Sequence, residues 1–317
     1  MATFLITGGA GFIGSNLAHS LASQGETVRI LDDFSTGRRA NVSGLGSAVE
    51  VIEGSVCDRA TLDKALRGVR YCLHQAAIPA VPRSIAAPEA TNHANVDGTL
   101  SVFVAARAAG VERVVYASSS SVYGNAQTFP LNETLPKAPI SPYAVSKAAG
   151  EMYAEVFSEL YGMDLVGLRY FNVFGPRQDP TSDYAAVIPR FVVRLLRGEA
   201  PIIFGDGTQA RDFTFVDNVV DANLRACRMP GPLRGVYNIA CGQPVSVLEL
   251  ARALSRLTGA DIAPEFHPAR AGDILRSWAD IGRARGAFAY EPSVSLEEGL
   301  AHTLRWLREE EGTSWRG

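Results

Sequence analysis

The sequence Thr7-Gly8-Gly9-Ala10-Gly11-Phe12-Ile13-Gly14 decides the fold that we predict for this chain. It follows a short apolar run, residues 3–7, that is typical of a buried strand. It opens a stretch, residues 12–22, whose apolar residues recur with helical spacing. Glycines at positions 9, 11 and 14 form the fingerprint of a dinucleotide-binding turn, because they let the backbone approach a pyrophosphate at the helix N-terminus. The predicted cofactor contacts on this turn are Gly8, Gly11, Phe12, Ile13 and Gly14.

Three residues further along complete this part of the predicted cofactor site. Asp32 ends the second predicted strand, roughly twenty residues after the glycine turn, where a carboxylate accepts hydrogen bonds from ribose hydroxyls. It would repel a 2′-phosphate, so NAD is favoured over NADP, although Arg38 and Arg39 in the next loop can suit NADP. Asp58 has two open interpretations, a contact with adenine or the N-cap of the helix that follows it. Ala76 follows the fourth strand, where a small side chain lets the cofactor pass close by.

The remaining apolar runs of the first half predict an α/β fold. Strands are expected at residues 27–31, 49–52, 70–74, 113–116 and 164–168, and helices at 59–66, 90–109 and 143–161. Strands that alternate with helices and are apolar on both faces indicate a parallel sheet covered on both sides. We therefore predict a doubly wound (Rossmann) domain over residues 1–170.

Beyond residue 170 the pattern changes, because prolines and glycines become frequent and the elements become shorter. Helices are expected at residues 187–196, 217–226, 247–257 and 296–307. We predict that residues 171–317 form a smaller, mixed α/β substrate lobe over the carboxyl ends of the strands, with some crossing of the chain between the lobes.

Composition limits the classes of function. The chain has 317 residues, 47% apolar and 20% charged, with a net charge of -3, so no basic field favours nucleic acid or an anionic membrane. No apolar run approaches the roughly 18 residues that span a bilayer, and no leader precedes the first strand, so we expect a cytoplasmic protein. The four cysteines lack metal-binding spacing, so no metal site is predicted.

A second motif, Tyr143-Ala144-Val145-Ser146-Lys147, predicts proton transfer at a carbinol carbon. Tyr143 and Lys147 are one helical turn apart and share a helix face. A phenol with an ordinary pKa near ~10 is a poor base, and we expect the Lys147 ammonium and a nearby cationic nicotinamide ring to lower that pKa. Ser119, in the serine run 118–121, would orient the substrate hydroxyl. Ser119, Tyr143 and Lys147 are the predicted catalytic residues, and the last two also contact the cofactor.

These motifs together resemble the extended short-chain dehydrogenase/reductases, and within them the nucleotide-sugar 4-epimerases. The segments that carry the resemblance are 7–14, 95–99 (Asn-Val-Asp-Gly-Thr), 118–124, 143–147, 168–176, 211–213 (Arg-Asp-Phe) and 270–273 (Arg-Ala-Gly-Asp). The resemblance implies that Tyr143 takes the proton of the sugar 4-hydroxyl while hydride passes from C4 to tightly bound NAD. The flat 4-keto sugar then turns over and is reduced on its other face. The UDP part would supply the binding energy.

The resemblance also implies a substrate site and an assembly. Asn95 joins the expected cofactor contacts. The expected substrate contacts are Arg83, Ser119, Ser120, Asn172, Phe204, Arg211, Arg270, Asp273 and Ser277. Among them, Arg211 and Arg270 would bind the diphosphate and Asp273 the uridine ribose, while Phe204 either packs on uracil or belongs to the core. A homodimer through helices 90–109 and 143–161 is expected.

Ser120 and Ser121 distinguish this chain from two relatives with the same framework. The resemblance places an Asp-Glu pair at these positions in 4,6-dehydratases, and a glutamate at the second position in UDP-glucuronate decarboxylases. Serine offers no group with a suitable pKa for such chemistry. Oxidation followed by re-reduction at one carbon is therefore favoured.

The choice of sugar rests on a few positions of the resemblance. Ser277 stands where strict glucose/galactose enzymes often carry tyrosine, which would leave room for a 2-acetamido group. The segments 177–180, 184–189 and 205–207 also resemble epimerases that tolerate UDP-GlcNAc and UDP-GalNAc. Arg83 is shared with UDP-glucuronate 4-epimerases, but Asn172 replaces their usual threonine. We favour UDP-glucose/UDP-galactose and UDP-GlcNAc/UDP-GalNAc; the alternatives are a UDP-glucuronate 4-epimerase, a nucleotide-sugar dehydrogenase or reductase, and a non-catalytic NAD-binding regulator.

Overall fold

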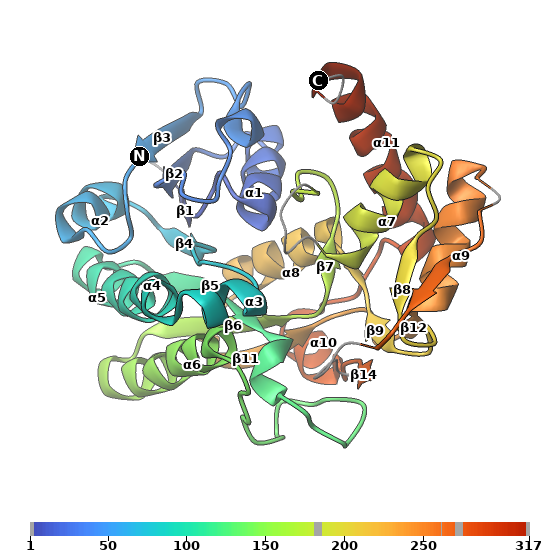
Figure 1. Ribbon diagram of the computed structural model, residues 1–317. Coiled ribbons are helices and arrows are strands. Elements are labelled where there is room, and N and C mark those ends of the chain that lie inside the picture. Colours follow the sequence, from blue (N-terminus) through green and yellow to red (C-terminus); the bar gives the residue numbers. More distant parts are fainter. Residues whose placement is uncertain (1–2, 181–185, 261, 270–274, 315–317) are drawn as a thin grey trace.

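A seven-stranded parallel sheet forms the centre of the larger lobe (Figure 1). The computed structural model describes residues 3–180, 186–260, 262–269 and 275–314. From edge to edge the strands are β11 (Gly235–Ile239), β6 (Asp164–Tyr170), β5 (Arg113–Ser119), β4 (Tyr71–His74), β1 (Phe4–Thr7), β2 (Val28–Asp32) and β3 (Val49–Glu53). Every neighbouring pair is parallel. This arrangement confirms the predicted doubly wound sheet.

The order of the strands reverses beside β1, which pairs with β2 on one side and β4 on the other. The chain runs from β1 to β2 and β3 on one side and then crosses to β4 on the other side of β1. The carboxyl ends of β1 and β4 therefore border a crevice at this switch point. Ligands of doubly wound sheets bind there. The glycine turn begins at this point, directly after Thr7.

Helices cover both faces of the sheet. α1 (Phe12–Ser23) and α8 (Val216–Arg228) pack together on one face, and α2 (Arg59–Leu66), α5 (Gly98–Ala109) and α6 (Pro142–Tyr161) form the layer on the other. Alternate residues of β1 serve the two layers, because Phe4 and Ile6 belong to one apolar cluster and Leu5 to the other. A strand buried on both faces must be apolar at every position, which explains the continuous apolar run.

The predicted helical stretch over residues 90–109 is confirmed, although a π-helical turn interrupts its regular α-helix. The chain forms α4 (Pro88–Asn92), the π-helical turn (His93–Asp97) and then α5. α3 (Val81–Ala86) precedes them and was absent from the sequence prediction. The wide turn directs Asn95 inward, where its side chain accepts a hydrogen bond from the backbone N of Ile78 at 2.7 Å. A π turn of this kind is frequent at functional sites.

Among the described residues, short strands and three helices build the smaller lobe. These helices are α7 (Val187–Leu196), α9 (Val247–Thr258) and α11 (Leu296–Ser314). α10 (Gly282–Phe288) packs instead on β11, at the edge of the large sheet. The strand sets are β7 (Val173–Phe174) with β10 (Thr214–Phe215), β8 (Ile202–Phe204) with β13 (Glu265–His267), and β12 (Pro244–Ser246) with β9 (Ala210–Asp212) and β14 (Arg276–Ser277). β11 and α8 follow residue 170 in the chain but belong to the large sheet and its helical layer. The chain therefore passes between the two lobes more than once.

Two further observations concern membranes and metals. Within the described ranges, none of the helices combines the length and apolar character needed to cross a membrane. The same residues contain no group of three or more His, Cys, Asp or Glu side chains placed to hold a metal ion. All four cysteines are free thiols.

Candidate active site

The glycine turn after β1 is shaped so that only glycine fits at its critical positions. Gly8 has a φ of +68°, and a Cβ there would lie 2.6 Å from the backbone N of Ala76. A Cβ on Gly14 would lie 2.1 Å from the carbonyl oxygen of Gly8. α1 begins after Gly11 with no side-chain cap, so its first N–H groups face the turn and can bind an anion. The turn therefore fits the pyrophosphate of a dinucleotide.

Asp32 lies at the end of β2 and is almost fully buried. Its carboxylate accepts hydrogen bonds from the backbone N of Ala10 and of Phe34, each at 2.8 Å, which leaves lone pairs for ribose hydroxyls. Burial raises the pKa of Asp32, and the two backbone bonds partly offset that rise. Arg38 pairs with Asp179 and Arg39 with Glu53. The two arginines that could favour a 2′-phosphate are thus already engaged with carboxylates.

Asp58 caps α2 in the structure, where its side chain accepts a hydrogen bond from the backbone N of Ala60. The N-cap interpretation is confirmed, and the adenine contact stays a prediction. Ala76 packs against Gly8, and its backbone N donates to the Thr7 hydroxyl at 3.3 Å.

The three predicted catalytic residues come together beside the carboxyl end of β5. Ser119 is the last residue of β5, while Tyr143 and Lys147 lie in the first two turns of α6. The Ser119 hydroxyl accepts a hydrogen bond from the backbone N of Ser121 at 3.2 Å, so its own hydrogen remains to be donated. Ser141 caps α6, and Pro142 occupies its first position. These local signals fix where Tyr143 points.

Burial dominates the pKa values of Tyr143 and Lys147 in the chain without cofactor. Burial raises the pKa of Tyr143, and hydrogen bonding with Ser119 only partly lowers it. Burial also lowers the pKa of Lys147 to about 8. The Lys147 ammonium donates to the carbonyl of Ala117 at 2.9 Å and lies 5.8 Å from the centre of the Tyr143 ring. In the chain without cofactor, desolvation of the phenolate therefore dominates the pKa of Tyr143. The expected lowering depends on Lys147 together with the nicotinamide ring and stays a prediction.

Side chains that the sequence reasoning missed hold the catalytic helix in place. The Ser146 hydroxyl donates to the carbonyl of Tyr143 at 2.8 Å and accepts from the Asn95 amide at 3.0 Å. The buried hydroxyl of Ser84 accepts from the backbone N of Tyr143 at 3.0 Å. All polar atoms of the Asn95 amide are engaged within the chain. Asn95 thus positions α6, and its contact with the cofactor stays a prediction.

A buried histidine links the ends of β1 and β4 behind the glycine turn. His74 Nδ1 lies 2.7 Å from the Thr7 hydroxyl, and Nε2 lies 3.0 Å from the Thr99 hydroxyl. Thr99 donates its hydrogen to the carbonyl of Asn95 at 2.6 Å, so Nε2 must carry the proton and Nδ1 must accept. Burial lowers the pKa of His74 to about 3, with the charge of Lys147 as a second cause. His74 is neutral, and no sequence motif had indicated its role.

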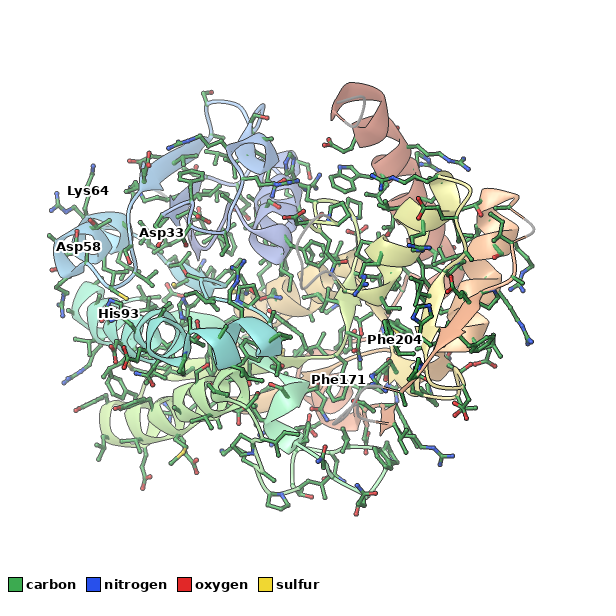
Figure 2. The ribbon with its side chains drawn as sticks, in the orientation of Figure 1. Asp33, Asp58, Lys64, His93, Phe171 and Phe204 are labelled. Atoms are coloured by element: carbon green, nitrogen blue, oxygen red, sulfur yellow. The ribbon has the colours of Figure 1, made fainter. Side chains whose placement is uncertain are left out.

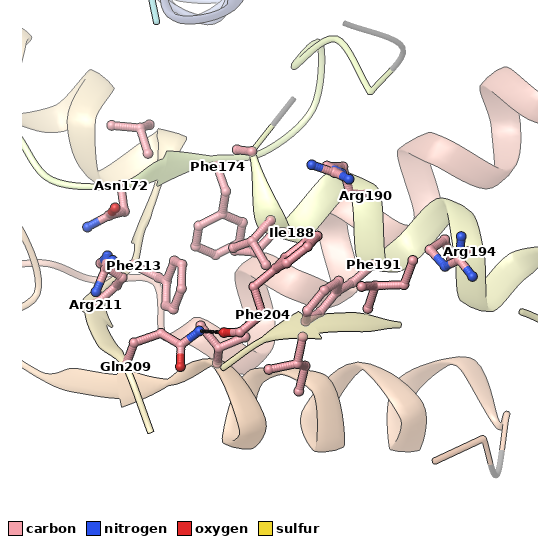
Figure 3. A pocket seen from close by; sticks show the side chains of 16 residues that line it. Asn172, Phe174, Ile188, Arg190, Phe191, Arg194, Phe204, Gln209, Arg211 and Phe213 are labelled. Carbon is pink, nitrogen blue, oxygen red and sulfur yellow. Dashed lines mark hydrogen bonds between the residues drawn. The ribbon is translucent and has the colours of Figure 1, made fainter. Parts of the chain in front are cut away.

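A cavity of about 300 Å³ lies in the smaller lobe between α7 and the strands β8 and β9 (Figure 3). It brings together three predicted substrate residues, Asn172, Phe204 and Arg211. Phe204 is only half-buried, and its ring meets that of His267 edge-on, with 5.7 Å between the ring centres. Arg190 and Arg194 of α7 also line the cavity. Their spacing of one helical turn is a signal that could have been found in the sequence.

The other predicted substrate residues that the structure describes lie outside the lining of this cavity, in separate parts of the chain. Ser277 is 9% exposed and lies opposite Arg211 in the pairing of β14 with β9. Ser120 is half-buried in the turn that follows Ser119. Arg83 is half-buried on α3, one residue before the Ser84 that binds the catalytic helix. Arg270 and Asp273 lie outside the described residues, as do residues 184–185 of the segment 184–189.

Comparison with known proteins identifies the family. The sequence pattern of the NAD dependent epimerase/dehydratase family matches residues 4–240. The chain belongs to this family. The match spans the glycine turn, the catalytic group and the start of the smaller lobe, and ends just after β11.

Relatives of this family match almost the whole chain. The UDP-glucose 4-epimerase of Mycolicibacterium smegmatis is 42% identical over 311 residues, which cover 96% of this chain and 98% of the relative. The solved UDP-N-acetylglucosamine 4-epimerase of Methanobrevibacter ruminantium M1, in complex with UDP-N-acetylmuramic acid, superimposes with a TM-score of 0.93 at 38% identity, over 98% of this chain and 99% of that one.

A second solved relative acts on an acidic sugar. The UDP-glucuronic acid 4-epimerase of Bacillus cereus, in complex with UDP-glucuronic acid and NAD, superimposes with a TM-score of 0.89 at 30% identity, over 97% of this chain and 99% of that one. Similarity in overall structure therefore does not separate the sugars.

Proposed function

We propose that this protein is an NAD-dependent 4-epimerase of UDP-hexoses, acting on UDP-glucose and UDP-galactose and on their 2-acetamido counterparts. The observation that carries the proposal is the strand order: β5, which ends at Ser119, lies between β1, which the glycine turn follows, and β6, which leads to the cavity residue Asn172. Tyr143 would hydrogen-bond Ser119 beside the end of β5. Asp58 and Phe204, at the expected adenine and uracil ends, lie in different lobes (Figure 2). A cofactor and a nucleotide sugar that meet at Tyr143 would span these two ends.

The residues of the glycine turn fit NAD. A Cβ on Gly8 or Gly14 would clash with the backbone of Ala76 or Gly8, so the turn stays as tight as a pyrophosphate site requires, and Asp32 favours a free 2′-hydroxyl. NAD, when bound, would supply the acceptor for hydride from the sugar C4 and the donor for its return. Its positive nicotinamide charge would add to that of Lys147 and favour the Tyr143 phenolate, which the protein alone does not.

The chain's own residues perform the proton transfer. Tyr143 would take the proton from the sugar 4-hydroxyl and, after the 4-keto sugar has turned, return it to the 4-keto oxygen as hydride adds to the opposite face of C4. Ser119, whose hydroxyl also hydrogen-bonds Tyr143, would donate to the substrate oxygen and keep it oriented. Lys147 is anchored through Ala117 and supplies positive charge to the same region. Ser120 and Ser121 provide no acid for elimination, so the cycle ends with reduction.

Binding energy comes from the UDP part of the substrate. We propose that Arg211 and Asn172 contact the diphosphate and that Phe204 packs on the uracil ring, because all three line the same cavity. The sugar is held less firmly, which permits its rotation. Ser277 lies beside Arg211 and is small enough to admit a 2-acetamido group.

A UDP-glucuronate 4-epimerase is the second candidate. Arg83 favours it, because this half-buried guanidinium lies on α3 beside the catalytic helix, where it could meet a sugar carboxylate. Asn172 argues for the neutral sugars, as the family resemblance implies threonine at that position in the uronate enzymes.

We also propose a homodimer through α5 and α6. One face of α6 carries apolar side chains that are 48–67% exposed: Val145, Met152, Val156 and Leu160. An exposed apolar stripe of this length is costly on a monomer. Sedimentation of the purified protein would show a species of about twice the 33.9 kDa chain mass; a monomer at micromolar concentration contradicts the dimer.

Absorbance at 340 nm during turnover tests the proposed reaction. An epimerase regenerates NAD in each cycle, so UDP-galactose is converted without added cofactor and without a net change at 340 nm. A dehydrogenase or reductase would change one cofactor for every sugar converted, and that stoichiometry would contradict the proposal.

A further inference from the structure

Asp212 is a fully buried carboxylate directly beside the proposed substrate cavity. Residues of β9 and its flanks alternate in direction: Gln209, Arg211 and Phe213 line the cavity, whereas Asp212 points to the opposite side of the strand. Arg211 is in contact with the site and Asp212 is hidden behind it. The chemistry proposed above gives Asp212 no task.

The Asp212 carboxylate is held by backbone amides from two distant segments. Cys241 N donates to Oδ1 at 2.8 Å, and Gly242 N donates to Oδ2 at 2.9 Å. Ala279 N donates to Oδ2 at 3.2 Å. Among the described parts of the chain, the partners of this carboxylate are backbone amides and no cation, and burying such a group carries a large desolvation cost. Such a group is a poor choice for stability alone.

Asp212 connects the end of β11 with two segments that carry predicted substrate residues. Cys241 and Gly242 follow β11, the edge strand of the large sheet. Ala279 comes two residues after Ser277, which pairs with Arg211. The backbone oxygen of Asp212 accepts a hydrogen bond from the Asn172 amide at 3.1 Å. The Asp212 carboxylate therefore ties β9 and the segment after Ser277 to the end of β11 in the large sheet, and the backbone of the same residue holds Asn172.

We infer that Asp212 is a positioning residue for nucleotide-sugar binding, whose carboxylate fixes β9 so that Arg211 and Asn172 meet the diphosphate together. The inference rests on the proposed binding of a UDP-sugar in this cavity. Asp212 acts through Arg211 and its neighbours and touches no reacting atom. Its removal should therefore weaken binding of the UDP part and leave the cofactor site intact.

The isosteric variant Asp212→Asn tests the inference, with UDP as the probe and calorimetry at pH 7.5 as the measurement. The new NH₂ group faces a backbone N–H, so one of the three amide bonds is lost. We expect UDP to bind at least tenfold more weakly, with unchanged NAD content. Burial raises the pKa of Asp212 to about 6, so the ionised form costs stability at pH 7.5 and the melting temperature should stay within a few degrees. Asp221→Asn, at a half-buried aspartate of α8 that pairs with Arg225, is the matched control and should leave UDP binding unchanged.

A double variant separates positioning from general structure. If Asp212 acts through Arg211, Asp212→Asn should weaken UDP binding little further in the Arg211→Ala background. Unchanged UDP affinity in Asp212→Asn, or a full additive loss in the double variant, overturns the inference. So does a parallel loss of NAD content and melting temperature, which would mark a purely structural role.

Two further results keep the test decisive. If Asp212→Asn does not fold, Asp212→Glu retains the charge and the acceptors but shifts them by one methylene; weaker UDP binding then supports the inference, and wild-type affinity overturns it. A wild-type protein that binds UDP but converts no UDP-sugar contradicts the proposed reaction, while the UDP affinities still decide the role of Asp212.

Discussion

The ammonium of Lys147 lies 5.8 Å from the centre of the Tyr143 ring, one helical turn away on α6. It donates its hydrogen bond to the carbonyl of Ala117 at 2.9 Å instead of to the phenol. Under the proposed mechanism, the lysine would therefore act on the tyrosine through space, as a charge anchored to the end of β5. Because burial raises the pKa of Tyr143 in the protein alone, the phenolate should form only when the cofactor adds its own positive charge.

Tyr143→Phe should retain the fold and the bound NAD and lose most of its turnover. Removing a positioned general base costs about 10²–10⁴-fold in rate. The measurement is kcat for UDP-galactose, with NAD content determined after denaturation. Tyr153→Phe, at an exposed position of the same helix, is the control and should keep full activity. A Tyr143→Phe protein with near-normal kcat would remove Tyr143 from its assigned role.

Asp32→Asn should weaken NAD binding and reduce the preference for NAD over NADP. Hydrogen bonds to a charged group contribute about 1.5–3 kcal/mol, so we expect roughly a 10–100-fold loss of NAD affinity. The repulsion of a 2′-phosphate disappears with the charge, so NADP affinity should fall less or rise. Binding of both cofactors to cofactor-stripped protein measures this, with Asp63→Asn, an exposed aspartate on α2, as the control. Equal losses for both cofactors would show that Asp32 does not discriminate between them.

Ser277→Tyr should suppress turnover of N-acetylated sugars and spare UDP-glucose and UDP-galactose. Ser277 is buried beside Arg211, so a tyrosine ring would fill the space that a 2-acetamido group needs. Steric selection of this kind is worth about 10–200-fold in kcat/KM. Ser277→Ala is the size-matched control and should act on both sugar classes. An equal loss on all four substrates would show that Ser277 is not the size gate.

His74 should make the stability of the protein depend on pH. Its pKa is about 3 in the folded chain and about 6.5 when unfolded. Above pH 6.5 neither state is protonated there; below it, only the unfolded chain takes up the proton. The free energy of unfolding should therefore fall by about 1.4 kcal/mol per pH unit from this group as the pH drops from 6.5 toward 3.

His74→Gln removes this titration and keeps one donor and one acceptor in the side chain. Urea unfolding at pH 6.0, 5.0 and 4.5 gives the free energy of unfolding at each pH. Its dependence on pH should be shallower in the variant than in the wild type by about 1.4 kcal/mol per pH unit. The variant should start about 1–3 kcal/mol less stable at pH 7, because its hydrogen bonds to Thr7 and Thr99 are imperfect. The same pH dependence of the free energy of unfolding in both proteins would mean that His74 takes up its proton as readily in the folded as in the unfolded chain, and would contradict the lowered pKa.

The large sheet and its helices could be predicted because their signals are local. Each strand of the first half is a short apolar run. Glycines with positive φ separate the elements, at Gly25, Gly68, Gly110 and Gly162. The glycine turn and the Tyr143–Lys147 pair depend on fixed spacings within a single turn or helix. The site residues that depend on such spacings were brought together as expected.

What could not be predicted depends on contacts between residues far apart in the chain. The pairings of β9 with β14 and of β8 with β13 involve strands of two or three residues, too short for a periodic pattern. The π turn at Asn95 forms because its side chain bonds to Ile78, and His74 is neutral because it is buried between two threonines. The raised pKa of Tyr143 likewise follows from burial, which spacing does not reveal.

Proton NMR of the purified protein with UDP-GlcNAc, and separately with UDP-glucose, tests the central claim most directly when no cofactor is added. The account predicts that resonances of the C4-inverted sugar appear in both samples and grow to a constant ratio, with the relative rates ranking the two substrates. No inverted sugar from either compound, even after NAD is supplied, would contradict it.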